Sequence, residues 1–227
     1  MAANAYPGHD TVVLPSGLYT LAIPGLDEDD GATGDLDITG DLTLTGNGST
    51  IDGAGLDRVL HTRRGAIVDI TGLTIRNGHV PVGTTAGYGG GIMNDGGTLT
   101  LTNVQIHSNV AGNPGGGEGG GIYSIWGGGV TLIDSSVTGN RATGPGGGLW
   151  IVGGTVDIVR STIDENLAGS AAGMKLLYTQ VTVDASTISN NVASGGWGYG
   201  GGWGYGGGFG NGRGDGWGKI DGSGTAD

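Results

Sequence analysis

Short segments that alternate hydrophobic and polar residues recur along the middle of the chain. Five of them align on one apolar anchor residue: ITGLTIRNG, LTNVQIHSN, LIDSSVTGN, IVRSTIDEN and VDASTISNN. The anchors lie 31, 31, 26 and 25 residues apart, at Ile75, Ile106, Val137, Ile163 and Ile188. A period of this length is typical of a solenoid, in which each repeat forms one coil.

The positions around each anchor keep their character from repeat to repeat. Aliphatic residues stand seven and five positions before the anchor, with mostly polar residues between them, which predicts a strand with one face inward. The column two positions before the anchor changes from larger to smaller residues, and we expect it to narrow toward the C-terminus: Leu73, Val104, Ser135, Ser161 and Ser186.

An asparagine column follows three positions after the anchor in four repeats, at Asn109, Asn140, Asn166 and Asn191. Asparagine tolerates the left-handed backbone of a bend, and stacked asparagines can hydrogen-bond from one coil to the next. We therefore predict a structural role for this column rather than a ligand-binding one.

A glycine-rich loop of variable length follows each bend and leads into another strand, beginning at Ile92, Ile122, Leu149 or Met174. Three short strands per coil, a bend and a loop predict an all-β fold, a single-stranded parallel β-helix of about seven coils. We expect the β-helix at 1–195 and a Gly/Trp/Tyr-rich tail at 196–227, with an irregular last coil as the alternative for this tail. We also expect the ends of the solenoid to be uncapped.

Composition narrows the classes of partner. The chain has 56 Gly but only 6 Pro and no strict three-residue period, which excludes collagen. With 9 Lys+Arg against 21 Asp+Glu, the net charge of -12 argues against nucleic acid as a partner. Cysteine is absent, no apolar run is long enough to span a membrane, and the first residues lack the blocks of a signal peptide.

Several phrases are similar to those of a known group: AANAYPGHDTVVLPSGLYTLAI, DLDITGDLTLTG, IDGAGLDRV and GLTIRNG. Over roughly residues 2–195 the chain resembles bacterial secreted and cell-surface proteins with a CSLREA motif upstream of a pectin-lyase-like right-handed β-helix, related to polymorphic outer-membrane-protein repeats. The resemblance implies a right-handed helix, export and surface display, but no single activity. In such relatives a helical N-terminal cap leads into an Ala-Ala-Asn phrase, so the resemblance implies a cap that would lie before Met1-Ala2-Ala3-Asn4.

Catalytic groups are not evident in the repeats. Hydrolases of this fold need clustered carboxylates, whereas Asp69 and Asp157 occupy equivalent outer positions about three coils, roughly 14 Å, apart. We therefore expect no enzymatic activity; a polysaccharide lyase or glycoside hydrolase is the enzyme class to consider otherwise. The histidines His9, His61, His79 and His107 lack metal-ligand spacing, and we expect them at the surface or in turns.

Calcium is the one cofactor that the sequence leaves open. Asp27, Asp29 and Asp30 lie together in an acidic loop, with further carboxylates nearby. Oxygen-rich loops bind calcium, but the spacing lacks an EF-hand pattern, and a solvated acidic loop is the favoured interpretation.

Large side chains mark two candidate binding regions. By alternation Met93, Tyr123 and Trp150 point outward, with Trp126 nearby, and such a column either stacks on sugar rings or lies under the glycine-rich loops. The tail carries aromatic residues that are candidates for self-association: Trp197, Tyr199, Trp203, Tyr205, Phe209 and Trp217.

The sequence thus predicts a non-catalytic, exported β-helix at the cell surface or outside the cell, acting as a stalk, adhesin or fibre-forming element. Exposed strand edges at uncapped ends favour end-to-end self-association. The alternative is a carbohydrate-binding or polysaccharide-degrading β-helix that uses an extracellular glycan. A third hypothesis is an ice- or surface-binding protein, although Ile133 and Val159 interrupt the threonine array that it requires.

Overall fold

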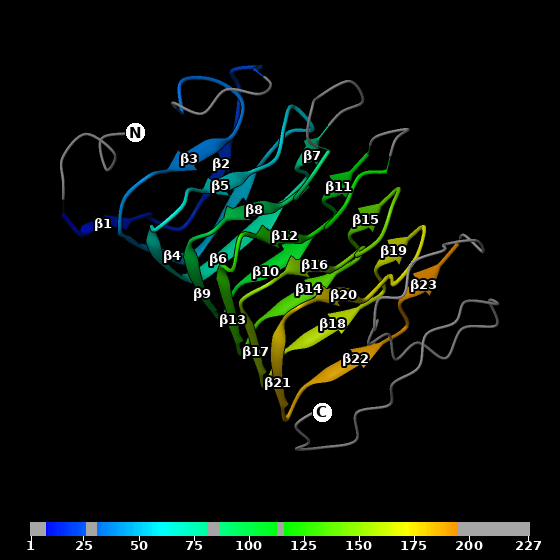
Figure 1. Ribbon diagram of the computed structural model, residues 1–227. Helices are drawn as coiled ribbons and strands as arrows, with labels where there is room; N and C mark the ends of the chain where they lie inside the picture. The colour runs from blue at the N-terminus through cyan, green and yellow to red at the C-terminus, as the bar shows by residue number, and fades with distance from the viewer. Residues whose placement is uncertain (1–7, 26–30, 81–86, 113–115, 195–227) are drawn as a thin grey trace.

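The chain folds into a right-handed parallel β-helix whose coils stack along one axis (Figure 1). The computed structural model describes residues 8–25, 31–80, 87–112 and 116–194. These residues form strands and about six turns of solenoid, where the sequence predicted about seven. The search for a long apolar helix that could cross a membrane found none in this described part.

The first coils differ from the later ones because two of their strands are long. β4 (Leu42–Asp52) and β6 (Ile67–Arg76) pair along two walls of the solenoid, with a register shift after Thr45. The shorter strands of this part are β1 (Asp10–Val13), β2 (Leu18–Thr20), β3 (Leu36–Ile38), β5 (Leu60–Thr62) and β7 (His79–Val80). β1 and β2 both pair with β4, so the first coil covers that strand on one side.

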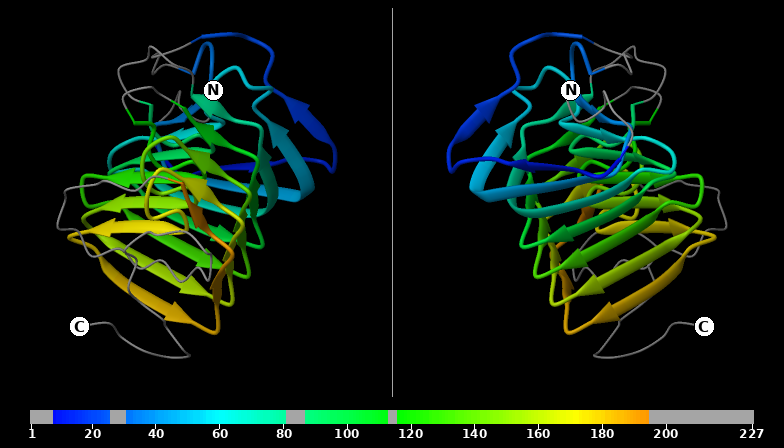
Figure 2. Two further views of the ribbon diagram at one scale, coloured as in Figure 1. Left: turned by 90° about the vertical axis from the view of Figure 1, so that its right-hand side faces the viewer. Right: turned by 90° about the vertical axis from the view of Figure 1, so that its left-hand side faces the viewer.

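The later coils repeat four strands, each stacked in a parallel row (Figure 2). The first row is β8 (Ile92–Asp95), β12 (Ile122–Ile125), β16 (Leu149–Val152) and β20 (Met174–Leu177). The second is β9 (Thr98–Thr102), β13 (Gly129–Ile133), β17 (Thr155–Val159) and β21 (Gln180–Asp184). The third is β10 (Gln105–His107), β14 (Ser136–Thr138), β18 (Thr162–Asp164) and β22 (Thr187–Ser189). The fourth is β11 (Val110–Ala111), β15 (Arg141–Ala142), β19 (Leu167–Ala168) and β23 (Val192–Ala193).

The register confirms the sequence alignment of the repeats. Each anchor residue is the direct partner of the next one along the solenoid: Ile75, Ile106, Val137, Ile163 and Ile188. Leu101, Leu132 and Ile158 are likewise partners, and all three are fully buried. Matching aliphatic side chains therefore form one continuous core along the axis.

Each repeated coil has four strands, one more than the three that the sequence predicted. After each bend asparagine a two-residue strand pairs with its equivalents, and its second residue is always alanine in the repeated coils. These alanines form a second, narrow core: Ala111, Ala142, Ala168 and Ala172, with Ala193 packed against them. A strand of two residues is too short to show alternation, so the sequence pattern did not reveal it.

Glycine triplets precede three of the four first-row strands, β8, β12 and β16, because the backbone turns and touches its neighbour there. In the triplet before β12, Gly119 has a φ of +66°, a left-handed conformation that suits glycine. A Cβ on Gly120 would lie 2.5 Å from the backbone oxygens of both Arg141 and Gly147 in the next coil. The repeated glycines therefore allow direct contact between successive backbones.

Candidate functional sites

The predicted outward column of large side chains exists but is covered. Met93, Tyr123, Trp150 and Lys175 are neighbours across the first-row strands. Tyr123 is only 4% and Trp150 only 7% exposed. The ring of Tyr88 stacks on Tyr123 at a centroid distance of 4.6 Å, and the Lys175 ammonium lies 4.0 Å from the centroid of the Trp150 ring. Of the two alternatives, the structure favours coverage, and these rings do not form an open platform.

Two charged side chains beside this column, Glu118 and Lys175, are partly buried. Burial raises the pKa of Glu118, and the Lys175 ammonium opposes that shift. Burial also lowers the pKa of Lys175, and the Glu118 carboxylate opposes it in turn. The two groups thus serve as partial counter-ions above the covered rings.

Trp126 behaves differently from the column beside it, because it stands at a corner of the solenoid. It is the first residue after β12, its φ is +61°, and its side chain is 66% exposed. The Arg64 guanidinium lies over the indole ring at 5.4 Å from its centroid. Such an exposed cation–π contact contributes ~0.5–1 kcal/mol and helps to orient the ring.

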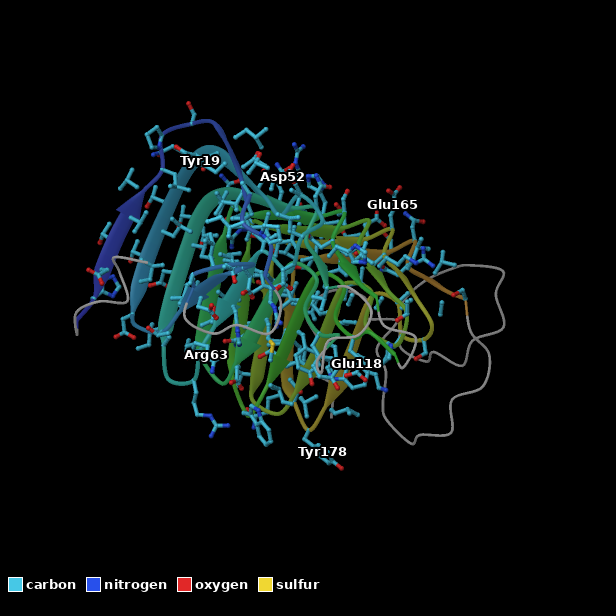
Figure 3. All side chains as sticks on the ribbon, turned by 90° about the horizontal axis from the view of Figure 1, so that it is seen from above. Tyr19, Asp52, Arg63, Glu118, Glu165 and Tyr178 are labelled. Atoms are coloured by element: carbon cyan, nitrogen blue, oxygen red, sulfur yellow. The ribbon has the colours of Figure 1, made fainter. Side chains whose placement is uncertain are left out.

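Tyr178 continues the same corner two coils further on. It is the first residue after β20, has a φ of +54°, and is 94% exposed (Figure 3). The strand between β12 and β20 is β16, and the residue that follows it is Gly153. We call Arg64, Trp126 and Tyr178 the corner ridge. Tyr178 was not among the residues predicted from the sequence, although it stands four positions after Met174 as Trp126 does after Ile122.

The asparagine column forms the coil-to-coil ladder that the sequence predicted, but the left-handed backbone expected at these residues falls one position earlier, as at Ser108 and Glu165. The side-chain oxygen of Asn140 accepts hydrogen bonds from the backbone nitrogen and from Nδ2 of Asn109, both at 3.0 Å. The same pattern joins Asn140 to Asn166 and Asn166 to Asn191. The first three of these side chains are fully buried and the last is 9% exposed, so the column is part of the interior.

The serine column is a second ladder, which the sequence analysis treated only as a narrowing of the core. The backbone nitrogens of Val104, Ser135 and Ser161 each donate to the serine Oγ of the following coil, at 2.9–3.0 Å. Each hydroxyl also donates to a carbonyl oxygen of its own chain segment. Serines repeated at one inward column, Ser135, Ser161 and Ser186, were the signal available in the sequence.

A buried polar cluster lies near the N-terminal end of the solenoid, on β3, β5 and the segments beside them. It contains Asp35, Asp37, Asp57, Arg58 and His61, none more than 5% exposed. The Arg58 Nε lies 2.8 Å from Asp35 Oδ2, and the His61 Nδ1 lies 3.2 Å from Asp37 Oδ1. Burial raises the pKa of Asp35 to about 8, against the opposing effect of Arg58. The prediction of a surface or turn position for His61 was therefore wrong.

Other sequence candidates are separated or lie outside the described residues. Asp69 and Asp157 sit three pairing steps apart in one row, through Thr100 and Thr131, as expected from the repeat. Asp27, Asp29 and Asp30 fall outside the described residues. So do the six aromatic residues of the tail, Trp197, Tyr199, Trp203, Tyr205, Phe209 and Trp217.

Comparison of the chain with family models, curated proteins and solved structures found no match. The class that the structure itself defines is the right-handed parallel β-helix. The candidate sites in its described part are the corner ridge and the buried polar cluster.

Proposed function

We propose that the chain is a non-catalytic, exported β-helix that acts as a surface adhesin and binds an extended polysaccharide along the corner ridge. The observation that carries this proposal is the exposure of Trp126 and Tyr178, 66% and 94%, at equivalent corners of one solenoid. Isolated large apolar side chains are common on surfaces, but two aromatic rings in line on a rigid scaffold are typical of a binding surface.

The spacing of the two rings suits a linear glycan. Two strand spacings separate the coils of Trp126 and Tyr178, or roughly 10 Å. In an extended β-1,4-linked glycan each pyranose ring is turned by half a revolution from the last, so every second ring presents the same face. Aromatic rings stack on the C–H face of a pyranose, and one ring per two coils matches one sugar in two.

The remaining positions of the ridge fit the same ligand. Gly96 and Gly153 follow β8 and β16, so the coils on either side of Trp126 add no bulk at this corner. The Arg64 guanidinium offers fixed hydrogen-bond donors to sugar hydroxyls or uronate carboxylates. A glycan chain can therefore follow the axis of the solenoid without steric hindrance from these corners.

Binding of soluble β-1,4-linked oligosaccharides and polysaccharides to the full chain tests this proposal, measured by calorimetry and affinity electrophoresis. Trp126→Ala and Tyr178→Ala should each weaken binding about tenfold, since a stacked aromatic anchor contributes ~1.4 kcal/mol or more. Tyr19→Ala is the matched control, because Tyr19 is also surface-exposed but lies on β2, away from the ridge. Absence of glycan binding, or equal losses in all three variants, would refute the proposal.

A second candidate function, a fibre-forming element, is favoured by the edge at the last described coil. Within the described residues, β20, β21, β22 and β23 each pair with one neighbour, β16, β17, β18 and β19. Strand edges of this kind pair with other chains. Electron microscopy of concentrated protein should then show filaments that shorten on Val181→Lys, while monodisperse particles at all concentrations would exclude this function.

A further inference from the structure

The buried polar cluster has the composition of a metal site. We propose that Asp35, Asp37 and His61 bind one divalent transition-metal ion, with Zn²⁺ as the reference ion, and that this ion ties β3 to β5. The proposal concerns the first coils of the solenoid and does not depend on glycan binding at the corner ridge.

The backbone brings the three side chains together. Asp37 and His61 are direct partners across β3 and β5, and Asp35 immediately precedes β3. One ligand atom from each of the three residues lies within 4.8 Å of the others. Ligand atoms of a tetrahedral zinc site lie roughly 3.4 Å apart, given bonds of ~2.1 Å, so small side-chain rotations would bring the three ligand atoms to that spacing and leave the fourth position to water.

Burial makes a cation favourable at this position. Asp35, Asp37 and Asp57 are buried together, at 3%, 0% and 2% exposure, and Arg58 is the buried guanidinium beside them. Buried carboxylates need compensating charge, since removing them from water costs several kcal/mol each. Arg63 adds a contact from the half-buried rim, its Nη1 3.4 Å from His61 Nδ1. With all three carboxylates ionised, they outnumber the two guanidinium groups of Arg58 and Arg63, and a divalent ion would supply the remaining positive charge.

Neighbouring groups hold the candidate ligands in position, as is usual around metal sites. The backbone nitrogen of Gly31 donates to Asp37 Oδ2 at 2.9 Å. Arg58 Nε contacts Asp35 Oδ2 at 2.8 Å, while Arg58 Nη1 lies 2.7 Å from the sulfur of Met93 on β8. These contacts fix the carboxylates from the side of the loop and from the side of the next coil.

The choice of ion follows from the mixed ligands. Two carboxylates with one imidazole suit Zn²⁺ and similar transition ions, whereas Ca²⁺ requires six to eight oxygen ligands. The coordinating set is drawn entirely from the first coils, so the ion would stabilise the part of the solenoid that precedes the regular repeats. This location also differs from the calcium candidates Asp27, Asp29 and Asp30 named in the sequence.

The test starts from the full chain after dialysis against a chelator. Addition of ZnSO₄ should give one bound zinc per chain by elemental analysis and raise the midpoint of thermal unfolding by roughly 5–10 °C at an excess of about 100 Kd. Co²⁺ in place of zinc should give visible absorption bands of low-symmetry coordination, which requires no variant. Absence of stoichiometric zinc and of the thermal shift would overturn the proposal, as would a response to Ca²⁺ alone.

Variants locate the ion. His61→Gln and Asp37→Asn should remove the bound zinc and the thermal shift, and circular dichroism of the metal-free variants checks that they fold. His107→Gln is the matched control, because His107 is a half-buried histidine on β10, on another wall. If either ligand variant fails to fold, the cobalt spectrum of the unchanged protein decides. Zinc bound equally by the folded ligand variants and by the control would place the ion elsewhere and refute the site.

Discussion

Replacing Asn140 with alanine removes the middle of the asparagine ladder. The Asn140 side chain is fully buried and makes four hydrogen bonds. Its oxygen accepts two of them from Asn109, and its Nδ2 donates to the carbonyl oxygen of Ile106 and to the side-chain oxygen of Asn166, at 2.9 and 3.1 Å. The backbone nitrogen of Asn140 keeps its own bond to Asn166.

The cost follows from the partners that lose their bonds. In Asn140→Ala, the backbone nitrogen of Asn109 and the carbonyl oxygen of Ile106 both lose a side-chain partner in the interior. A buried polar group without a partner costs ~1–3 kcal/mol. Because Asn109 Nδ2 retains the Ile75 carbonyl, Asn166 retains a backbone donor, and Ile106 lies in a strand paired on both sides, the backbone nitrogen of Asn109 carries most of the loss. The free energy of unfolding should therefore fall by about 2 kcal/mol.

Urea unfolding followed by circular dichroism measures this change, with Thr138→Ala as the control on the outer face of the same coil. Thr138 is half-buried on β14, and its replacement should change stability by less than about 0.5 kcal/mol. If Asn140→Ala and Thr138→Ala had the same midpoint of unfolding, the ladder would not be a source of stability and the argument from unpaired partners would fail.

Three further predictions use the same urea assay. Ser161→Ala should cost ~1–3 kcal/mol, because the backbone nitrogen of Ser135 loses its acceptor; an unchanged midpoint would contradict this. Leu132→Ala, at a fully buried position of the core, should cost ~2–5 kcal/mol, and a smaller loss would show that the neighbouring coils collapse into the cavity. Gly120→Ala should cost about 3 kcal/mol, since the new Cβ would meet two backbone oxygens at 2.5 Å, whereas a variant as stable as the parent would show that the coils can separate there.

The repeated coils could be predicted from the sequence because every column is sampled several times. One coil with Leu132 and Val137 is weak evidence, but five aligned coils determine both the period and the inward face. The asparagine ladder followed for the same reason. The first coils have few such columns. Asp37 and His61, 24 residues apart, come together because β3 pairs with β5, and the repeat pattern does not predict that pairing.

The covered aromatics show a second limit of the pattern. Alternation correctly placed Tyr123 and Trp150 on the outer side of their strands, yet both are buried. What covers Tyr123 is the ring of Tyr88, which reaches it from a segment of irregular length before β8. Periodicity reports which side of a strand a residue occupies, whereas coverage depends on loops that differ between coils.

The two polar ladders make the coils interchangeable. In each ladder the backbone nitrogen of one coil donates a hydrogen bond to the asparagine or serine side-chain oxygen of the following coil. Tandem duplication of the unit 135–160, which is one 26-residue period, would therefore lengthen the rod by one strand spacing, ~4.8 Å, with every bond in the ladders preserved. The same duplication would move Trp126 and Tyr178 from two coils apart to three. A change in the number of coils can thus alter the distance between surface residues such as Trp126 and Tyr178 without changing the contacts inside the solenoid.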